Sequence, residues 1–264
     1  MNLKAAIFDI DGTLLPVGAP CLSARTLRAL RALQAQGTLV IVATGRALFA
    51  ARAVLGTFRP DVLAAASGNW IVDRDGAPVR ENRMTEEEMY ALVDYCEDYE
   101  IPLDFIFEDG YHAYVEYDAF VRYAEPHQGN HSFLVDGEDQ VRHLQSMPYG
   151  ASALLTERDV TGFEGKYGHL GLRFVPFRGI HCDILRAGTN KAKALEDVLA
   201  EREIPWENAA AFGDGLNDAE LLEKAGMAVA MANGVPELCR RADLVAPDAA
   251  LDGVAQVIES RFLR

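Results

Sequence analysis

The chain has 264 residues, of which 50% are hydrophobic and 25% are charged, which suffices for one large domain or two modest ones. Its formal net charge of -15 would repel a phosphate backbone, so we expect no nucleic-acid partner and attribute the charge to solubility. No apolar run approaches the ~20 residues of a membrane helix. The four cysteines are far apart, and acids stand where a signal peptide needs its apolar core, so a cytoplasmic protein with reduced thiols is expected.

Residues up to about position 80 alternate between strand and helix patterns. Leucines at helical spacing predict a helix over residues 23–36, which Gly37 ends, and a second helix is predicted over 47–55. Apolar runs typical of buried strands lie before, between and after these two helices, at residues 5–8, 38–43 and 62–66. This strand–helix–strand rhythm predicts a parallel sheet.

The pattern changes near residue 83. Thr85 and Glu88 form a capping-box pattern that predicts a helix reaching about Tyr99. Two hairpins are predicted further on: residues 103–107 with 111–116, and residues 170–175 with 180–185 around the turn Pro176-Phe177-Arg178-Gly179. Because local hairpins indicate antiparallel pairing, residues 83–186 are expected to form a separate α+β unit.

The alternating rhythm resumes at Asn190. The expected elements are a helix to Ala200, strands at 209–212 and 227–231, a helix at 219–224 and a last helix from about Leu251. The fold class predicted is α/β, with a doubly wound, mostly parallel sheet. Residues 1–82 and 187–264 would form this core, with residues 83–186 as an inserted domain.

Three predicted strands run into polar loops. They are followed by Asp9-Ile10-Asp11-Gly12-Thr13-Leu14-Leu15, by Thr44-Gly45-Arg46 and by Gly213-Asp214-Gly215-Leu216-Asn217-Asp218. Ligands of open α/β sheets bind outside the carboxyl ends of the strands. We therefore expect the three loops to meet at one edge of the sheet.

Together with Lys191, these loops resemble the four motifs of the haloacid dehalogenase superfamily of phosphatases, and of its Cof-type branch in particular. Their order and spacing cover nearly the whole chain. The resemblance implies a haloacid dehalogenase-like core, a cap formed by the insert, and a small phosphorylated metabolite as substrate: a sugar phosphate, a nucleotide or a phosphorylated cofactor. The chain departs from the family at Ala192, where glycine is usual, and at Ala187, where proline is common.

The acids are the candidate catalytic residues and metal ligands. Asp9 can accept a phosphoryl group, forming an aspartyl-phosphate that water then hydrolyses. Asp11 suits the general acid–base role, because Asp9 cannot serve as nucleophile and proton carrier at once. Asp214 is expected to complete a Mg²⁺ site with Asp9, since a hard cation relieves repulsion among carboxylates and phosphate. The resemblance adds the backbone carbonyl of Asp11 as a metal ligand.

Other residues are expected to hold the phosphate. Thr44 and Gly45 offer a hydroxyl and an amide before a helix, which favours anions. Lys191 at a helix start opposes the helix dipole, and neutralising a phosphoryl group would explain it. Lys193 is a rival in the wrong register. The expected set is completed by Asn217 and the amide of Ile10.

Two of these interpretations stay open. Arg46 fits either a substrate contact or a surface ion pair. Asp218 would orient Lys191 or a metal-bound water, as the resemblance implies, but Asn217 and Asp218 also fit a plain helix N-terminus.

Two further patterns are not assigned a function. Glycines at positions 162, 165, 168 and 171 are interpreted as a short loop without the P-loop pattern. His127 and His131 have helical metal-ligand spacing, but Pro126 and Gly129 disfavour a helix, so a loop pair is expected.

The sequence therefore predicts a Mg²⁺-dependent phosphatase, monomeric or homodimeric, whose cap is hinged near Asn82-Arg83 and Ala187-Gly188. A phosphomutase is the first alternative, and it would return the phosphoryl group to a sugar without releasing inorganic phosphate. A non-enzymatic sensor of phosphorylated metabolites is the second, although a sensor needs no nucleophile.

Overall fold

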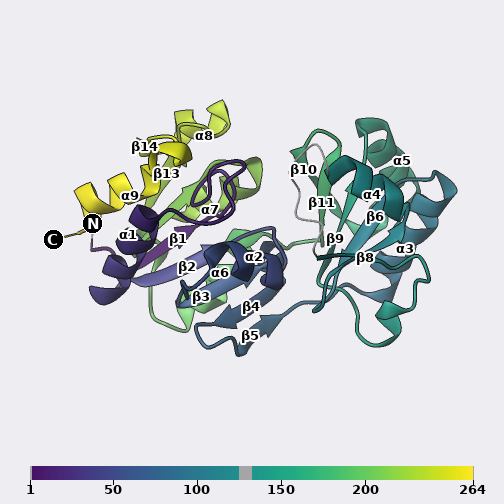
Figure 1. Ribbon diagram of the computed structural model, residues 1–264, viewed down its shortest axis with the longest axis horizontal. Helices are drawn as coiled ribbons and strands as arrows, with labels where there is room; N and C mark the ends of the chain where they lie inside the picture. The colour runs from purple at the N-terminus through teal and green to yellow at the C-terminus, as the bar shows by residue number, and fades with distance from the viewer. Residues whose placement is uncertain (1, 125–132, 264) are drawn as a thin grey trace. The chain divides into compact units, whose positions relative to one another are not determined.

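The computed structural model describes residues 2–124 and 133–263, and the chain divides into two compact units (Figure 1). Unit 1 comprises residues 1–80 and 190–264, and unit 2 comprises residues 81–189. Every candidate site residue named above belongs to unit 1. His127 and His131 lie outside the described residues.

Unit 1 is built on an eight-stranded sheet in the order β14-β13-β12-β1-β2-β3-β4-β5. Its strands are β1 (Ala5–Phe8), β2 (Leu39–Ala43), β3 (Val62–Ala65), β4 (Trp70–Asp73), β5 (Pro78–Glu81), β12 (Ala209–Gly213), β13 (Met227–Met231) and β14 (Leu244–Ala246). The pairs from β14 to β3 are parallel, whereas β4 runs antiparallel to β3. This confirms the predicted mostly parallel sheet, to which β4 and β5 at one end and β14 at the other are unpredicted additions.

Helices cover both faces of this sheet. The helices are α1 (Ala24–Ala35), α2 (Leu48–Leu55), α6 (Lys191–Ala200), α7 (Ala219–Lys224), α8 (Pro236–Arg241) and α9 (Gly253–Val257), which continues as a π-helical turn over Ile258–Phe262. Along β1, Ala6 and Phe8 share a core with α1, α2 and α9, whereas Ala5 and Ile7 share one with α6, α7 and α8. This alternation is what makes the sheet doubly wound.

Unit 2 contains a six-stranded sheet in the order β10-β11-β9-β6-β7-β8. Its strands are β6 (Leu103–Ile106), β7 (Tyr111–Val115), β8 (Leu134–Asp136), β9 (Gly150–Leu154), β10 (Arg173–Arg178) and β11 (His181–Leu185), and its helices are α3 (Glu86–Asp98), α4 (Tyr117–Ala124) and α5 (Glu157–Tyr167). Helices α3 and α5 share the larger core with the sheet, while Phe120 of α4 packs with Ala113 and Leu154 in a smaller one. Both predicted hairpins are present as antiparallel pairs.

Two local expectations in unit 2 are wrong. Strand β10 continues through the expected turn to Arg178, with a register shift between Pro176 and Arg178. The first part of the expected glycine-rich loop belongs to helix α5, which contains Gly162. A Cβ atom at Gly162 would lie 2.2 Å from Tyr95 Oη, so glycine permits the close approach of Tyr95, whose hydroxyl donates to the Asp159 carbonyl.

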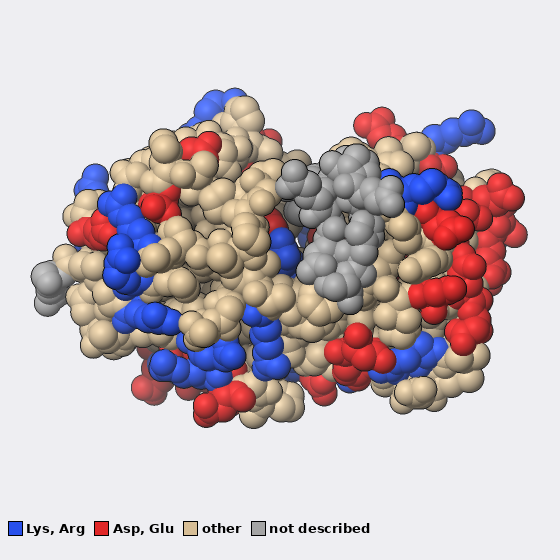
Figure 2. All heavy atoms as spheres, viewed as in Figure 1, with Lys and Arg blue, Asp and Glu red and all other residues tan. Residues whose placement is uncertain are grey.

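The negative charge of the chain is concentrated in unit 2. Residues 81–189 contain 21 acidic and 8 basic side chains, against 19 and 17 in the rest of the chain. Figure 2 shows acidic side chains gathered on this unit, on the right of the view. Unit 1, which carries the candidate site, is thus close to neutral. Within the described ranges, no helix has the length and apolarity to cross a membrane.

Candidate active site

The two acidic loops leave neighbouring strands at the same level. Strands β1 and β12 pair in parallel with Phe8 opposite Phe212, and these two rings stack with centroids 4.7 Å apart. The backbone amide of Asp9 then donates to the Phe212 carbonyl at 3.1 Å. Asp9 and Asp214 therefore lie side by side at the carboxyl edge of the sheet.

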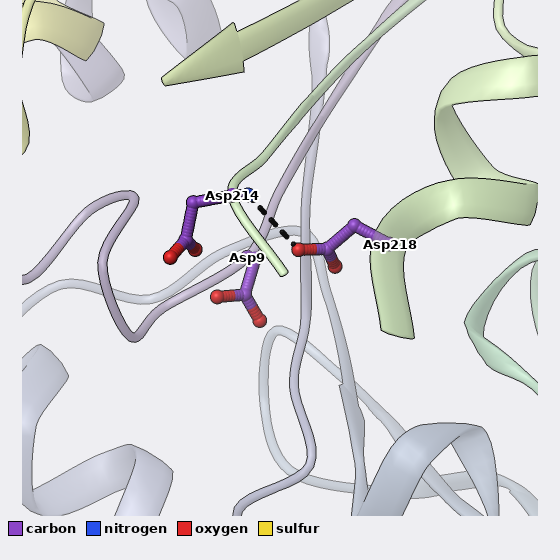
Figure 3. A group of neighbouring side chains, drawn as sticks. All are labelled: Asp9, Asp214 and Asp218. Atoms are coloured by element: carbon purple, nitrogen blue, oxygen red, sulfur yellow. Dashed lines mark hydrogen bonds between the residues drawn. The ribbon is translucent and has the colours of Figure 1, made fainter. Parts of the chain in front are cut away.

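Three carboxylates gather at this edge. Oxygen atoms of Asp9, Asp214 and Asp218 all lie within 4.8 Å of one another. Figure 3 shows the three side chains gathered together. Asp9 and Asp218 are buried, and Asp214 is partly exposed. Such a cluster of oxygen ligands suits a hard divalent cation.

Gly12 makes the close approach of the two loops possible. Its φ of +78° is one that side chains rarely adopt, and a Cβ atom there would lie 2.1 Å from Asp214 Oδ2. The next residue, Thr13, donates from its hydroxyl to Asp214 Oδ1 at 3.0 Å. The first acidic loop thus orients the carboxylate of the second.

Lys191 lies at the centre of the cluster. It begins helix α6, is 1% exposed, and donates to Asp9 Oδ1 at 2.5 Å and to Asp218 Oδ1 at 2.7 Å. Burial opposes the charge, but the carboxylates of Asp218 and Asp9 raise the pKa of Lys191 above its usual range. Lys193 points elsewhere, with an exposed ammonium 3.7 Å from Glu196.

Asp218 uses both of its oxygen atoms within the protein. Oδ1 accepts from Lys191, and Oδ2 accepts from the backbone amides of Asp214 and Gly215, each at 3.1 Å. The side chain is completely buried. Asp218 therefore holds both the lysine and the Asp214 loop in place.

The surroundings of Asp9 and Asp214 disfavour the charged form of each carboxylate. Burial raises the pKa of Asp9 well above its usual range, with Lys191 opposing this and Asp218 and Asp11 adding to it. Burial, with Asp218, also raises the pKa of Asp214 to about 6. Among the described residues, no donor reaches Asp9 Oδ2 or Asp214 Oδ2. These two oxygen atoms are therefore available to an ion or a substrate.

Arg46 pairs with the candidate acid–base residue. Its guanidinium makes two hydrogen bonds to Asp11, from Nε to Oδ2 at 2.7 Å and from Nη2 to Oδ1 at 2.6 Å. Both side chains are partly exposed. Of the two roles left open for Arg46, the structure thus shows an ion pair, made with a residue of the site itself. Two parallel bonds of this kind fix the carboxylate plane of Asp11.

A profile of the haloacid dehalogenase-like hydrolases matches residues 6–258. The chain belongs to this family, in its Cof-type branch. Phosphoglycolate phosphatase from Methanothermobacter thermautotrophicus is 28% identical to the hydrolase, over 99% of each protein. The fold is similar to that of a phosphatase of the superfamily from Bacteroides thetaiotaomicron, with a TM-score of 0.84 and 23% identity over 97% of this chain and 94% of that one. A subclass IIB sugar phosphatase has a TM-score of 0.78 and 22% identity, over 97% and 98% of the two chains. The hydrolase is accordingly a phosphoric monoester hydrolase.

The other residues expected in the site of the hydrolase lie on the same loops. Thr44 is buried, and its Oγ1 accepts from the Arg46 amide at 3.1 Å across Gly45. The Ile10 carbonyl accepts from the Leu15 amide at 2.8 Å, which closes the first loop. Asn217 lies partly exposed in the short helix Leu216–Asp218.

Asn233 also contributes to the site of the hydrolase, although its sequence context does not predict this. Its amide nitrogen donates to the Gly12 carbonyl at 2.7 Å, and its amide oxygen accepts from the Ala249 amide at 2.9 Å. Nearby, the Val235 amide donates to the Asp214 carbonyl at 2.9 Å. The loop after β13 thus supports both acidic loops. Only a strand end before Asn233 marks this in the sequence.

Proposed function

We propose that the hydrolase is a Mg²⁺-dependent phosphatase that acts on small phosphorylated metabolites through an aspartyl-phosphate on Asp9. The observation that carries the proposal is the hydrogen bonding of the two carboxylate oxygen atoms of Asp9. One oxygen is held by Lys191 at 2.5 Å, and the other has no donor among the described residues. A buried carboxylate fixed in this way presents its second oxygen as a nucleophile.

The chemistry then needs one further proton carrier. Asp9 attacks phosphorus, and the bond to the leaving oxygen breaks as Asp11 protonates that oxygen. Asp11, now ionised, takes a proton from water, which attacks the aspartyl-phosphate and releases inorganic phosphate and free Asp9. Arg46 orients the Asp11 carboxylate by donating to both of its oxygen atoms. One of these bonds must open before that oxygen carries the proton to the leaving group, and the other keeps Asp11 in place.

The excess of negative charge among the candidate site residues supports the binding of a divalent cation. The candidate site residues include four carboxylates and two cations: Asp9, Asp11, Asp214, Asp218, Lys191 and Arg46. A phosphate group would add further negative charge to this excess. Asp9 and Asp214, with the carbonyl of Asp11, would hold Mg²⁺. When bound, Mg²⁺ would neutralise charge between the carboxylates and the phosphoryl oxygens and help to orient the phosphoryl group.

We also propose that unit 2 is the cap that selects the leaving group. All four motifs lie in unit 1, so unit 2 is available for specificity. Within unit 2, Arg186 donates to Asn82 Oδ1 at 2.5 Å, to the Arg83 carbonyl at 2.7 Å and to Glu88 at 2.7 Å. These bonds join the first residues of unit 2 to its last ones. We therefore place the hinges outside the bonded residues, at residues 80–81 and 187–189.

The charge of unit 2 bears on the substrate class. A cap with a large excess of acidic residues disfavours a leaving group that is itself anionic. Of the related proteins named above, the sugar phosphatase releases an uncharged leaving group, whereas phosphoglycolate phosphatase releases an anionic one. We favour an uncharged leaving group such as a sugar, whose phosphate monoester should be preferred to the corresponding bisphosphate at low ionic strength. Added salt should narrow that preference, because it screens exposed charges.

The test is release of inorganic phosphate from a panel of phosphate monoesters, with Mg²⁺ and with excess chelator. Asp9→Asn should fold and bind phosphate but lose turnover by about 10⁴-fold, as expected for loss of a nucleophile. Turnover without phosphate release, with transfer to a second hydroxyl of a sugar, would indicate a mutase. Binding without any turnover would indicate a sensor. Full activity in chelator would contradict the metal assignment.

A further inference from the structure

The loop between β3 and β4 has an unusual backbone. Three consecutive residues have positive φ: Ala66 at +47°, Ser67 at +56° and Gly68 at +95°. Only the third is a glycine, and left-handed conformations are unfavourable for alanine and serine. No described residue hydrogen-bonds the Ser67 hydroxyl, so its side chain does not compensate. The turn must be held by its surroundings.

The first side of the turn contacts the candidate phosphate loop. The Ser67 amide donates to the Thr44 carbonyl at 2.8 Å, and the Ala66 amide donates to the Arg46 carbonyl at 2.8 Å. Both residues are buried. The left-handed conformation points these successive amides at one loop. The turn therefore fixes the backbone on either side of Gly45.

The second side of the turn contacts the helix that carries Lys191. A Cβ atom at Gly68 would lie 2.2 Å from the Cβ atom of Ala194 and 3.5 Å from the Asn190 carbonyl oxygen. Gly68 thus lets the first turn of α6 approach the loop more closely than any side chain would permit. The turn lies between the Thr44 loop and the start of α6.

We propose that the turn Ala66–Gly68 is a positioning element that sets the Thr44–Arg46 loop against the start of α6, so that Thr44 and Lys191 hold the same phosphoryl group. This inference rests on the proposed phosphatase function. It goes beyond that function by assigning a role to residues outside the four motifs. A turn that only connected β3 to β4 would need neither the two amide contacts nor the close approach to Ala194.

The test compares two glycines with similar positive φ angles, +95° at Gly68 and +83° at Gly37. Gly68→Ala adds a methyl group at the turn, whereas Gly37→Ala adds one at a φ of +83° with nothing within 4 Å, between α1 and β2. Each variant is assayed for its thermal midpoint, for kcat and KM with a small aryl phosphate, and for inhibition by inorganic phosphate. Stabilisation by inorganic phosphate with Mg²⁺ gives a reading that needs no turnover.

Gly68→Ala should lower kcat by about 10- to 100-fold and weaken phosphate binding by about 10-fold, because misplacement by a fraction of an ångström is costly in an active site. Adding Ala194→Gly to this variant should restore part of kcat and of phosphate binding, since it removes the Cβ atom that the new methyl group would overlap. Gly37→Ala should lose stability with kinetics within about twofold of wild type. Gly68→Ala kinetics equally close to wild type would overturn the proposal.

A second variant, Ser67→Gly, tests the proposal even if Gly68→Ala does not fold. Ser67→Gly removes backbone strain without adding atoms, so it should raise the thermal midpoint while loosening the loop and weakening phosphate binding. Unchanged phosphate binding would contradict the positioning role. If the wild type binds phosphate but hydrolyses no ester, the proposed function fails. The positioning role of the turn is then tested by phosphate binding alone, compared between the variants and the wild type. If the wild type does not bind phosphate, both fail.

Discussion

Replacing Asp104 with asparagine should remove a pH dependence from the stability of unit 2. Asp104 lies on β6, is 5% exposed, and accepts a hydrogen bond from Ser152 Oγ at 2.9 Å. Burial raises the pKa of Asp104 from 3.8 to about 7; the Ser152 bond opposes this shift, and Asp183 adds to it. In the folded protein this carboxyl group therefore keeps its proton over a range in which the unfolded chain has lost it.

The size and sign of the effect follow from linkage. A shift from 3.8 to about 7 corresponds to about 4 kcal/mol, at ~1.4 kcal/mol per pKa unit. The folded state binds the additional proton, so the free energy of unfolding falls as pH rises through this window. The loss is complete above about pH 7. Asparagine cannot ionise and can still accept from Ser152, so the variant should gain on the wild type by up to about 4 kcal/mol between about pH 4 and about pH 8.

Urea titrations at several pH values test this expectation, and the chain separates the signals of its two units. Both tryptophans belong to unit 1 and all nine tyrosines to unit 2, so tyrosine and tryptophan fluorescence report on different units. Asp94→Asn, at an exposed position of α3, is the matched control and should show no such trend. A stability difference between wild type and Asp104→Asn that stays constant with pH would refute the reasoning.

Four further outcomes are expected. Lys191→Met should destabilise unit 1 by about 3–5 kcal/mol in urea titrations, because it leaves buried carboxylates unpaired; the exposed Lys193→Met is its control. Arg46→Lys cannot make the two parallel bonds to Asp11, so kcat should fall while unfolding changes by less than ~1 kcal/mol; an unchanged kcat would contradict the orienting role. Mg²⁺ at 100 times its dissociation constant should stabilise the protein by about 2.7 kcal/mol in thermal scans, and Asp214→Asn should abolish this. Arg186→Gln should destabilise unit 2 by about 3 kcal/mol, read from tyrosine fluorescence, because buried Glu88 loses its charged partner and keeps, within the described part of the chain, only the hydrogen bond from the Thr85 amide.

The sheet of unit 1 was predictable because its signals are local. Each strand of a parallel sheet is buried on both faces and reads as a continuous apolar run, as at Ala5–Phe8 and Ala209–Phe212. The polar residues that follow must then lie at the carboxyl edge. Which loops become neighbours depends on strand order, and the pairing of β1 with β12 joins segments about 200 residues apart. No local pattern contains that information.

The errors arose where tertiary contacts override local preference. Glycine at position 162 disfavours a helix, yet α5 forms because that glycine admits Tyr95. The turn expected at Pro176–Gly179 moved because β10 accommodates an irregularity in its pairing with β11. Asn233 escaped notice for a related reason, since its contacts with the Gly12 and Ala249 backbone exist only in the folded chain.

Lys191 shows how an unfavourable local feature can mark a site. A lysine at the first position of a helix opposes the helix dipole, and burying an ammonium removes its hydration. Both costs must be offset, and the carboxylates of Asp9 and Asp218 at 2.5 and 2.7 Å do this. Those two carboxylates are themselves buried, and the lysine pairs with both of them. None of the three charges is favourable alone, so the group is stable only as a set. The local conflict at Lys191 therefore indicated that other charges had to meet it, while their identity and geometry came from the fold.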